Sequence, residues 1–585
     1  MTDRLASLRS ALNKESIDGF ILPVNDEFMG EYVPDSAKRL EWLTGFTGSA
    51  GLTVILKDKA AFFTDGRYTL QAKTQVKGFE LYNSGDVSPE KWLSEHADDG
   101  DIVAYDPRLH TLQSLRRYEK NAPHVIWQPV LANPVDALWK NRPAAPASAA
   151  VQQPMEYAGE SAAAKRKRIG VLVAGAGADA FIMTAPDSIC WLLNLRGADV
   201  PFTPFLLCNA LLDASGNVTL YIDRLRISEE LQKAFGSGVT LKLPQDICHD
   251  LGSLSGKRVL YDPANSPVWF HQQLSKANAE VVEGVDPCQL PKACKNGAEL
   301  EGMRQAHIRD GLAVTKFLYW LEHAVAAGKK LTEIDIAEKL EIFRRESDLY
   351  LEPSFATISG SGPNGAIVHY HATRESNRSV EHNSLLLIDS GGQYPDGTTD
   401  ITRTVAIGTP SEEMKRHFTL VLKGHIALAT AVFPEGTNGM QIDALARQYL
   451  WKAQLDYDHG TGHGVGSHLS VHEGPQRISK RSSDTALIPG MIVSNEPGYY
   501  SAEKYGIRIE SLVAVRKLGK TEDGGKAFFG FETITLAPLD MNLVDKTILT
   551  KEEQNWLREY HKRVYDIHVN DLTANEAAWL SKTHS

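Results

Sequence analysis

Four carboxylates and one histidine within a single stretch of the chain do most to limit how it can fold. An apolar run over 385–388 ends at Asp389, an alternating segment begins at Asp400, and residues suited to a turn lie between them at 395–397. This pattern predicts a β-hairpin in which Asp389 and Asp400 lie directly opposite each other on one face of the sheet. Two negative charges placed this way repel each other, and a bound cation would remove that repulsion.

The other three candidate ligands come from separate segments. His463 lies among four glycines in 459–466, which allow the backbone to bend tightly around it. Glu496 follows an apolar, strand-like run at 491–493, and Glu510 lies in a segment that alternates apolar and polar residues. Four carboxylates and one imidazole suit a pair of hard or borderline cations such as Mn²⁺ better than a structural zinc ion, which prefers thiolates.

These five residues occur in the phrases DSGGQYPDGTTDITRT, HGTGHGVG, NEPGYY and GIRIES. Together they resemble the dinuclear metal centre of the pita-bread aminopeptidases. The similarity is greatest to the Xaa-Pro aminopeptidase family in its long, three-domain form, and it covers essentially the whole chain. The resemblance implies an α/β fold: two tandem creatinase-N-type α/β domains followed by a pita-bread α+β catalytic domain.

The resemblance also implies a function. The chain would be a metal-dependent aminopeptidase that hydrolyses the Xaa-Pro bond at the N-terminus of short peptides with proline at position 2. Two divalent metal ions, with Mn²⁺ as the expected metal, would hold a hydroxide between them and polarise the peptide carbonyl. By resemblance, Asp400 and Glu510 would bridge the ions. Asp389 would bind one ion, and His463 and Glu496 would bind the other.

Further roles follow from the same resemblance. Glu496 would also carry the proton of the nucleophile to the leaving amine, which matters because the nitrogen of a bond to proline carries no hydrogen. His369, His459 and His472 would contact the substrate, and His369 and His472 would take part in the reaction, since a neutral imidazole can donate to an oxyanion. Arg508 is a candidate partner of the neighbouring ligand at position 510.

The domain organisation is indicated by two internal repeats. The sequence Asp18-Gly19-Phe20-Ile21 recurs as Asp179-Ala180-Phe181-Ile182, and a linker rich in proline and alanine lies between the copies. We therefore expect domain I at 1–145, domain II at 155–291, and a catalytic domain with a C-terminal helical extension at 292–585. Within the last domain a Gly-to-Ile-Asp pattern recurs 108 residues later, as two like halves of a pita-bread fold would require.

Composition excludes several classes of function. The formal net charge of −11 argues against nucleic acid or an anionic membrane as a general partner. The chain has no apolar run of membrane-spanning length and no signal-peptide pattern at its start, so we expect a cytoplasmic protein. The five cysteines lack metal-site spacing and are expected to be reduced, buried thiols. A homodimer is expected from the resemblance alone.

Alternative functions share the same fold. Creatinase-type enzymes work without metal, and methionine aminopeptidases lack two N-terminal domains. Prolidase, an Xaa-Pro dipeptidase, uses the same ligand set with one N-terminal domain, so the tandem repeat favours the aminopeptidase. A non-catalytic binding protein of this fold is the alternative from another class, and the intact ligands and histidines argue against it.

Overall fold

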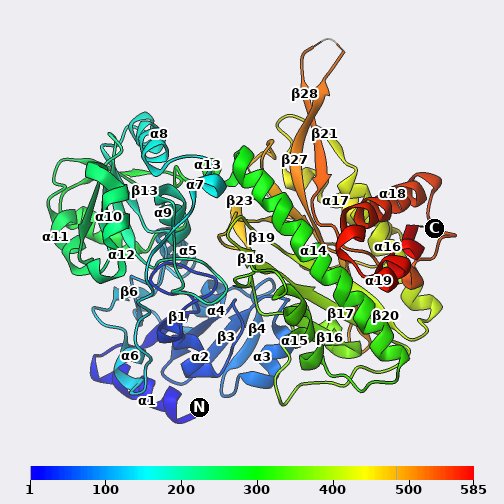
Figure 1. Cartoon of the computed structure of the whole chain (residues 1–585). Helices are drawn as coiled ribbons and strands as arrows, with labels where there is room; N and C mark the ends of the chain where they lie inside the picture. Colours follow the sequence, from blue (N-terminus) through cyan, green and yellow to red (C-terminus); the bar gives the residue numbers. More distant parts are fainter. Residues whose placement is uncertain (1, 482–483, 523, 585) are drawn as a thin grey trace. The chain divides into compact units, whose positions relative to one another are not determined.

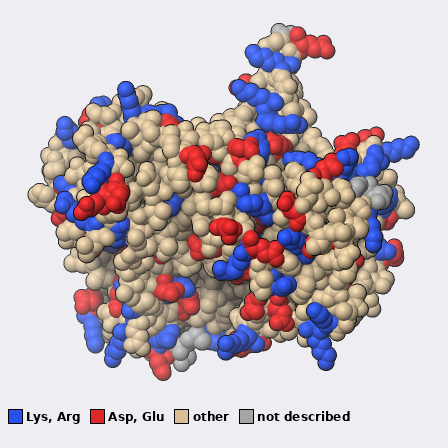
Figure 2. All heavy atoms as spheres, viewed as in Figure 1, with Lys and Arg blue, Asp and Glu red and all other residues tan. Residues whose placement is uncertain are grey.

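A computed structural model of the chain describes residues 2–481, 484–522 and 524–584. The chain divides into two compact units, which are Met1–Met155 with Glu160–Gln289, and Glu156–Gly159 with Leu290–Ser585. Within the described residues, no helix combines the length and the apolar character that a membrane crossing needs. Acidic and basic side chains are interspersed over the face drawn in Figure 2.

The first unit contains two six-stranded mixed sheets with the same topology. The first has strand order β4-β3-β2-β1-β5-β6 and the second β12-β11-β10-β8-β13-β14. In each sheet the first strand pairs antiparallel with the second and parallel with the fifth. The strands are β1 (Gly19–Pro23), β2 (Leu52–Leu56), β3 (Ala60–Thr64), β4 (Glu80–Asn83), β5 (Ile102–Tyr105), β6 (Ile126–Pro129), β8 (Ala180–Met183), β10 (Asn209–Asp213), β11 (Val218–Tyr221), β12 (Val239–Lys242), β13 (Arg258–Tyr261) and β14 (Glu280–Glu283).

Matching side-chain contacts support the repeat that the sequence predicts. A carboxylate oxygen of Asp18 accepts a hydrogen bond from the backbone N–H of Ile102 at 2.8 Å, and one of Asp179 accepts from that of Arg258 at 2.9 Å. Each aspartate directly precedes the first strand of its sheet and ties it to the fifth. The two motifs therefore make equivalent contacts in their two sheets.

Helices cover these sheets and complete the unit. They are α1 (Thr2–Lys14), α2 (Arg39–Thr44), α3 (Thr69–Gln75), α4 (Pro89–His96), α5 (Leu112–Asn121), α6 (Pro134–Leu138), α8 (Ala162–Gly175), α9 (Pro186–Leu193), α10 (Glu229–Phe235), α11 (Ile247–Gly252) and α12 (Val268–Lys276). A small sheet joins β7 (Val151–Gln152) to β9 (Leu195–Arg196). Buried residues from both halves, such as Trp92 and Trp269, belong to one hydrophobic cluster, so the two α/β domains share part of their core.

The second unit is built from two similar helix pairs packed on sheets. The helices are α14 (Gly297–Ala326), α15 (Glu333–Arg344), α16 (Glu412–Ala429) and α17 (Gly439–Lys452). The first pair packs against β17 (Ser384–Ser390) and β20 (Ile401–Ile407). Helix α17 packs against β24 (Ile492–Asn495), β27 (Ser511–Lys520) and β28 (Ala527–Thr533). The sequence predicted these two like halves.

Local sequence explains where these helices begin. Thr332 and Asp335 form a capping box before α15, and Asn438 and Gln441 form one before α17. The turn before each of these helices contains a glycine with positive φ, Gly328 at 71° and Gly436 at 91°, a backbone conformation that side chains with a Cβ rarely adopt.

The sheets of this unit carry the candidate ligands. One has the order β16-β17-β20, and a six-stranded sheet has the order β21-β28-β27-β24-β22-β23. The remaining elements are α7 (Met155–Ala158), α13 (Gln289–Ala293), β15 (Glu352–Pro353), β16 (Ile358–Ser361), β18 (Gly392–Tyr394), β19 (Gly397–Thr398), β21 (Val432–Pro434), β22 (Gly462–Gly464), β23 (Glu473–Ile478), β25 (Gly498–Ser501), β26 (Tyr505–Arg508), α18 (Lys551–His568) and α19 (Ala574–Ser581). In Figure 1, α14 runs along this unit and β27 and β28 project from it as a long hairpin.

The predicted hairpin between β17 and β20 forms, but its register differs from the expectation. Asp389 pairs with Thr402, and Tyr394 pairs with Gly397 across a two-residue connection. Gly397 belongs to β19 rather than to the turn, which moves the centre of the hairpin one residue along the chain. The prediction that Asp389 and Asp400 lie directly opposite each other is therefore wrong. They still share one face of the sheet, because Asp400 is two residues from Thr402.

The cysteines are all free. Cys190, Cys208 and Cys288 are buried, whereas Cys248 is exposed, so the expectation of buried thiols is wrong for that residue.

Candidate metal centre

Five strand ends bring the candidate ligands together. Asp389 lies in β17, Asp400 directly precedes β20, His463 lies in β22, Glu496 directly follows β24, and Glu510 directly precedes β27. The backbone N–H of Glu510 donates to the carbonyl of Thr402 at 3.2 Å, so the start of β27 meets β20. This contact joins the segments that carry the first two aspartates to the sheet that carries the other ligands.

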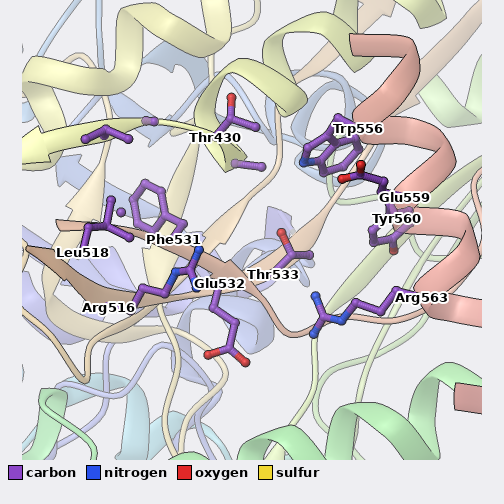
Figure 3. Close-up of a pocket in the computed structure, with 14 residues that line it drawn as sticks. Thr430, Arg516, Leu518, Phe531, Glu532, Thr533, Trp556, Glu559, Tyr560 and Arg563 are labelled. Atoms are coloured by element: carbon purple, nitrogen blue, oxygen red, sulfur yellow. The ribbon is translucent and has the colours of Figure 1, made fainter. Parts of the chain in front are cut away.

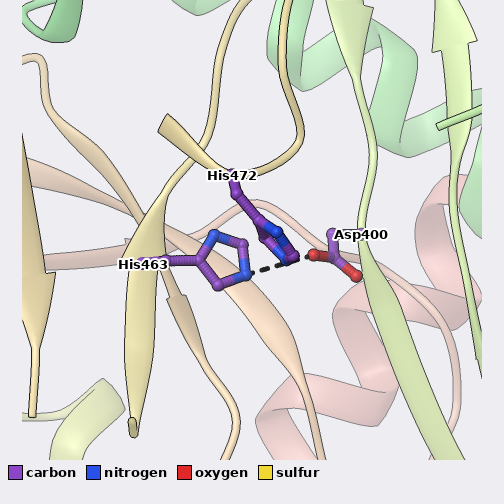
Figure 4. A group of neighbouring side chains, drawn as sticks. All are labelled: Asp400, His463 and His472. Atoms are coloured by element: carbon purple, nitrogen blue, oxygen red, sulfur yellow. Dashed lines mark ion pairs between the residues drawn. The ribbon is translucent and has the colours of Figure 1, made fainter. Parts of the chain in front are cut away.

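The donor atoms form three overlapping groups of three. Within each group the ligand atoms lie within 4.8 Å of one another, and the groups are Asp389, Asp400 and Glu510; His463, Glu496 and Glu510; and Asp400, His463 and His472. Figure 4 shows the third group, in which both histidine rings lie next to Asp400. The first two groups share Glu510, so two neighbouring cations held by them would share one carboxylate.

The orientation of His463 suits a metal ligand. Its Nδ1 lies 2.8 Å from the carbonyl oxygen of Gly464 and must carry the hydrogen, because that oxygen can only accept. The lone pair of Nε2 then faces Asp400 Oδ2 at 3.4 Å and Glu496 Oε1 at 3.6 Å. A lone pair aimed at two carboxylates requires a proton or a cation between them.

The charges of the protein groups lead to the same conclusion. Burial, followed by the nearby Asp400 carboxylate, raises the pKa of Glu510 well above its usual range. Burial also raises the pKa of Asp389 to about 6, against the opposing effect of Arg508. Burial disfavours the charged form of His463, but Asp400 and Glu496 outweigh it and raise its pKa to about 9. The protein groups thus hold excess negative charge that protons or cations must balance.

One ligand atom is left without a partner. Oδ1 of Asp389 is buried and accepts no hydrogen bond from any described residue, although the other oxygen is bonded to Arg508. A buried carboxylate oxygen without a donor is costly, and a cation would satisfy it. The donor set, its charge and this oxygen all fit a pair of divalent cations.

Arg508 organises the cluster from within. It is 2% exposed and donates to Asp389 Oδ2 and to the hydroxyl of Tyr500, both at 2.6 Å. Its Nε donates to Thr402 Oγ1 at 3.0 Å, and that hydroxyl donates to Glu510 Oε2 at 2.7 Å. Arg508 therefore contacts Asp389 directly and reaches Glu510 through Thr402.

Of the three histidines expected at the substrate, two lie against the cluster and the third follows a residue that contacts Arg508. His459 has Nε2 at 2.8 Å from the Tyr500 hydroxyl and Nδ1 at 3.7 Å from Glu496 Oε2. The His472 ring lies 4.4 Å from that of His463, and its nitrogen is close enough to Asp400 to be a metal ligand. His369 directly follows Val368, whose carbonyl accepts from Arg508 Nη2 at 3.4 Å.

Tyr500 and Thr402 were not predicted from the sequence. Tyr500 lies in the phrase NEPGYY together with the candidate ligand Glu496, and its hydroxyl joins Arg508 to His459. Burial raises the pKa of Tyr500, so this hydroxyl keeps its proton at neutral pH. Thr402 would have followed from the correct hairpin register, because it lies directly opposite Asp389.

Comparison with known proteins places the chain in a family. Residues 301–517 match the model of metallopeptidase family M24. A protein of Talaromyces stipitatus named "Probable Xaa-Pro aminopeptidase P" is 39% identical over 607 residues, which cover 99% of this chain and 92% of that protein. The chain belongs to metallopeptidase family M24.

Other matches define its place within family M24. Residues 4–137 and 141–299 match models of the creatinase/prolidase N-terminal domain, and 527–584 match the C-terminal region of the M24 peptidases. The crystal structure of X-prolyl aminopeptidase from Caenorhabditis elegans, described as a cytosolic enzyme with a di-nuclear active site, has a TM-score of 0.95 at 34% identity and covers 100% of this chain and 99% of that one. The predicted fold, with two N-terminal domains before the catalytic one, is confirmed.

A prolidase shares only part of this architecture. The structure from Pyrococcus horikoshii has a TM-score of 0.50 at 24% identity and covers 64% of this chain and 99% of that one, which shows similarity of fold. This chain is therefore longer than that prolidase, which aligns with 64% of it.

The second compact unit also contains a pocket. It has a volume of about 400 Å³ and lies between the base of the β27–β28 hairpin and α18. Figure 3 shows Arg516, Glu532, Trp556 and Arg563 around it. None of the candidate ligands or histidines lines this pocket.

Proposed function

We propose that this protein is a metal-dependent Xaa-Pro aminopeptidase, which hydrolyses the first peptide bond of peptides with proline at position 2. The observation that carries the proposal is the pair of donor groups that share Glu510. The relatives named Xaa-Pro aminopeptidase match the chain over nearly its full length. Support for this substrate class comes from those names and from the two N-terminal domains.

Five residues would hold two divalent cations, and the proposed metal is Mn²⁺. They are Asp389, Asp400, His463, Glu496 and Glu510. Carboxylate oxygens with a single imidazole are a donor set that suits Mn²⁺. When bound, the two cations would supply a Lewis acid for the peptide carbonyl and a water molecule acidic enough to act at neutral pH.

Glu496 is proposed to move the proton. The nitrogen of the bond to proline must gain a proton before it can leave, because it carries none in the peptide. Burial raises the pKa of Glu496, which favours the protonated carboxyl that can give its proton to this nitrogen. His459 Nδ1 lies 3.7 Å from the Oε2 atom of Glu496.

His369, His459 and His472 are proposed to position the substrate. A neutral imidazole can donate to the oxygen that becomes negatively charged as the carbonyl is attacked. Because Tyr500 contacts both His459 and Arg508, its hydroxyl links this histidine to the ligand Asp389. His369 and His472 are proposed to act in the reaction itself.

The test compares two substrates. Metal-free protein is incubated with Gly-Pro-Ala and with Gly-Pro after addition of Mn²⁺, Co²⁺ or Zn²⁺, and metal content is measured in parallel. We expect two ions per chain, release of free glycine from the tripeptide, and little hydrolysis of the dipeptide. Faster hydrolysis of Gly-Pro would favour a prolidase, the main alternative. Absence of hydrolysis with every metal would favour a non-catalytic binding protein.

Location and assembly are further parts of the proposal. The description of the C. elegans relative as cytosolic supports a cytoplasmic location for this protein. A homodimer is proposed from the family resemblance and is tested by the mass measured in solution by light scattering.

A further inference from the structure

His369 lies in a long loop that needs an anchor. The loop runs from the end of β16 at Ser361 to the start of β17 at Ser384, and its regular structure is limited to a short 3₁₀ segment, Gly362–Ala366, and an isolated β-bridge between Ser379 and Thr332. A loop of this length with little secondary structure is held only by specific contacts. The position of His369 relative to the cluster depends on those contacts.

One buried carboxylate binds this loop at several points. Glu333, the first residue of α15, is 0% exposed. Its Oε1 accepts from the backbone N–H of Ser361 at 2.7 Å and from Asn364 Nδ2 at 2.9 Å. Its Oε2 accepts from the hydroxyl of Tyr370 at 2.8 Å and from the backbone N–H of Arg378 at 2.9 Å. These four donors span the loop from one end almost to the other.

The hydrogen bonds of the Glu333 carboxylate explain how this side chain can be buried. All four donors are neutral, and a buried carboxylate without a cationic partner is stable only when its oxygens are fully hydrogen-bonded. The position at the beginning of α15 adds the favourable field of the helix N-terminus. Glu333 also uses its own backbone N–H, which donates to the carbonyl of Arg378 at 3.0 Å.

Tyr370 connects the Glu333 carboxylate with His369, the residue before it in the chain. Burial, with the Glu333 carboxylate, raises the pKa of Tyr370, so its hydroxyl keeps the proton that it donates. The hydroxyl also lies 2.9 Å from the carbonyl of Ser376, but a carboxylate is the stronger acceptor. On the other side of His369, the carbonyl of Val368 accepts from Arg508, which binds Asp389.

His369 therefore lies between two anchors, one on the metal cluster and one on α15. We propose that Glu333 is a positioning residue of the reaction: through Tyr370 it holds His369 in the orientation in which that histidine meets the substrate. This inference rests on the proposed function, and it adds a residue that lies outside the ligands and the substrate histidines.

The experiment is a double-mutant cycle with Gly-Pro-Ala and Mn²⁺. Glu333→Gln keeps the shape of the side chain but turns an NH₂ group toward donors. We expect kcat to fall roughly tenfold to a hundredfold, the scale of a small displacement of a catalytic group, while two metal ions stay bound. In the His369→Ala background the same change should alter kcat by less than about twofold, because the group that Glu333 positions is already absent.

Two further variants control the result. Tyr370→Phe removes one donor and leaves the carboxylate with the other three, so it serves in the same cycle should Glu333→Gln fail to fold. Asp335→Asn makes the same carboxylate-to-amide change on the same helix, at an exposed residue that bonds Thr332 and not the loop, and it should keep wild-type kcat.

The outcomes separate this inference from the proposed function. Equal losses from Glu333→Gln, or from Tyr370→Phe, in both backgrounds would show a general structural role and overturn the inference alone. Full activity of His369→Ala would also overturn the inference. The proposed aminopeptidase function would still hold in that case, because the wild-type protein would bind metal and cleave Gly-Pro-Ala. A wild-type protein that binds no metal and cleaves neither peptide would overturn both.

Discussion

Replacing Glu510 by Gln should stabilise the metal-free protein and weaken the metal-loaded one. Glu510 is 2% exposed, and its ligand oxygen lies within 4.8 Å of those of Asp389 and Asp400. Two carboxylates at that distance repel by roughly 3 kcal/mol at an effective dielectric constant of about 20. Burial and these neighbours raise the pKa of Glu510 well above 4.5, so folding of the metal-free chain favours the protonated form of this carboxyl.

The direction and size of the change in unfolding free energy caused by Glu510→Gln follow from proton linkage. The folded state binds a proton that the unfolded state releases above pH 4.5, so the free energy of unfolding of the metal-free protein falls as pH rises above that value. At pH 7 the cost in unfolding free energy is at most about 3.5 kcal/mol, at roughly 1.4 kcal/mol for each pH unit above 4.5. Glutamine needs no proton, so Glu510→Gln removes this cost.

Thermal unfolding at pH 5, 7 and 8, with a chelator or with Mn²⁺, measures the effect. With the chelator at pH 7, Glu510→Gln should raise the unfolding temperature by several degrees, because 1 kcal/mol corresponds to about 2–4 °C for a unit of this size. The difference in unfolding temperature between variant and wild type should be smaller at pH 5. With Mn²⁺ the wild type should be the more stable protein, because the variant has lost a ligand shared by both groups.

Glu532→Gln is the matched control. The guanidinium of Arg304 lowers the pKa of Glu532, so this substitution should destabilise the protein with or without metal. The reasoning is refuted if metal-free Glu510→Gln unfolds at or below the wild-type temperature at pH 7, or if Mn²⁺ stabilises it as much as the wild type.

Three further predictions test the site and the fold. Arg508→Lys should lower kcat/KM about a hundredfold with metal retained, since one ammonium cannot replace the fork that binds Asp389 and Tyr500; wild-type kinetics would contradict this. His369→Ala and His472→Ala should each lose roughly 10² to 10⁴ in rate and still bind two ions, and metal loss on analysis would make the affected histidine a ligand. Burial lowers the pKa of His425 to about 3, so as the pH falls from 6.5 to 3 the unfolded state binds a proton before the folded state does, and the wild type loses stability. In urea unfolding, the unfolding free energy of His425→Gln should fall by about 1.4 kcal/mol less per pH unit than that of the wild type. Equal pH dependence of the two proteins would contradict this prediction.

Local signals were enough to predict much of the fold. The capping boxes at Thr332 and Thr550 place the starts of α15 and α18, since each box is complete within four residues. The repeated aspartates at 18 and 179 each bond within their own sheet, so similar sequence gave similar structure. The five candidate ligands are brought together by strands whose apolar runs were visible in the sequence.

The contacts that orient the ligands could not be predicted in this way. The hairpin register depends on whether Gly397 belongs to the turn or to a strand, and the turn residues alone allow both. Arg508 bonds Thr402, 106 residues away in sequence, and no local pattern links them. The same holds for Glu333 and Tyr370, which are 37 residues apart. Each motif preserves the local geometry of one ligand, whereas the angles between ligands are set by side chains of other segments, and these can be paired only once the strands have been paired.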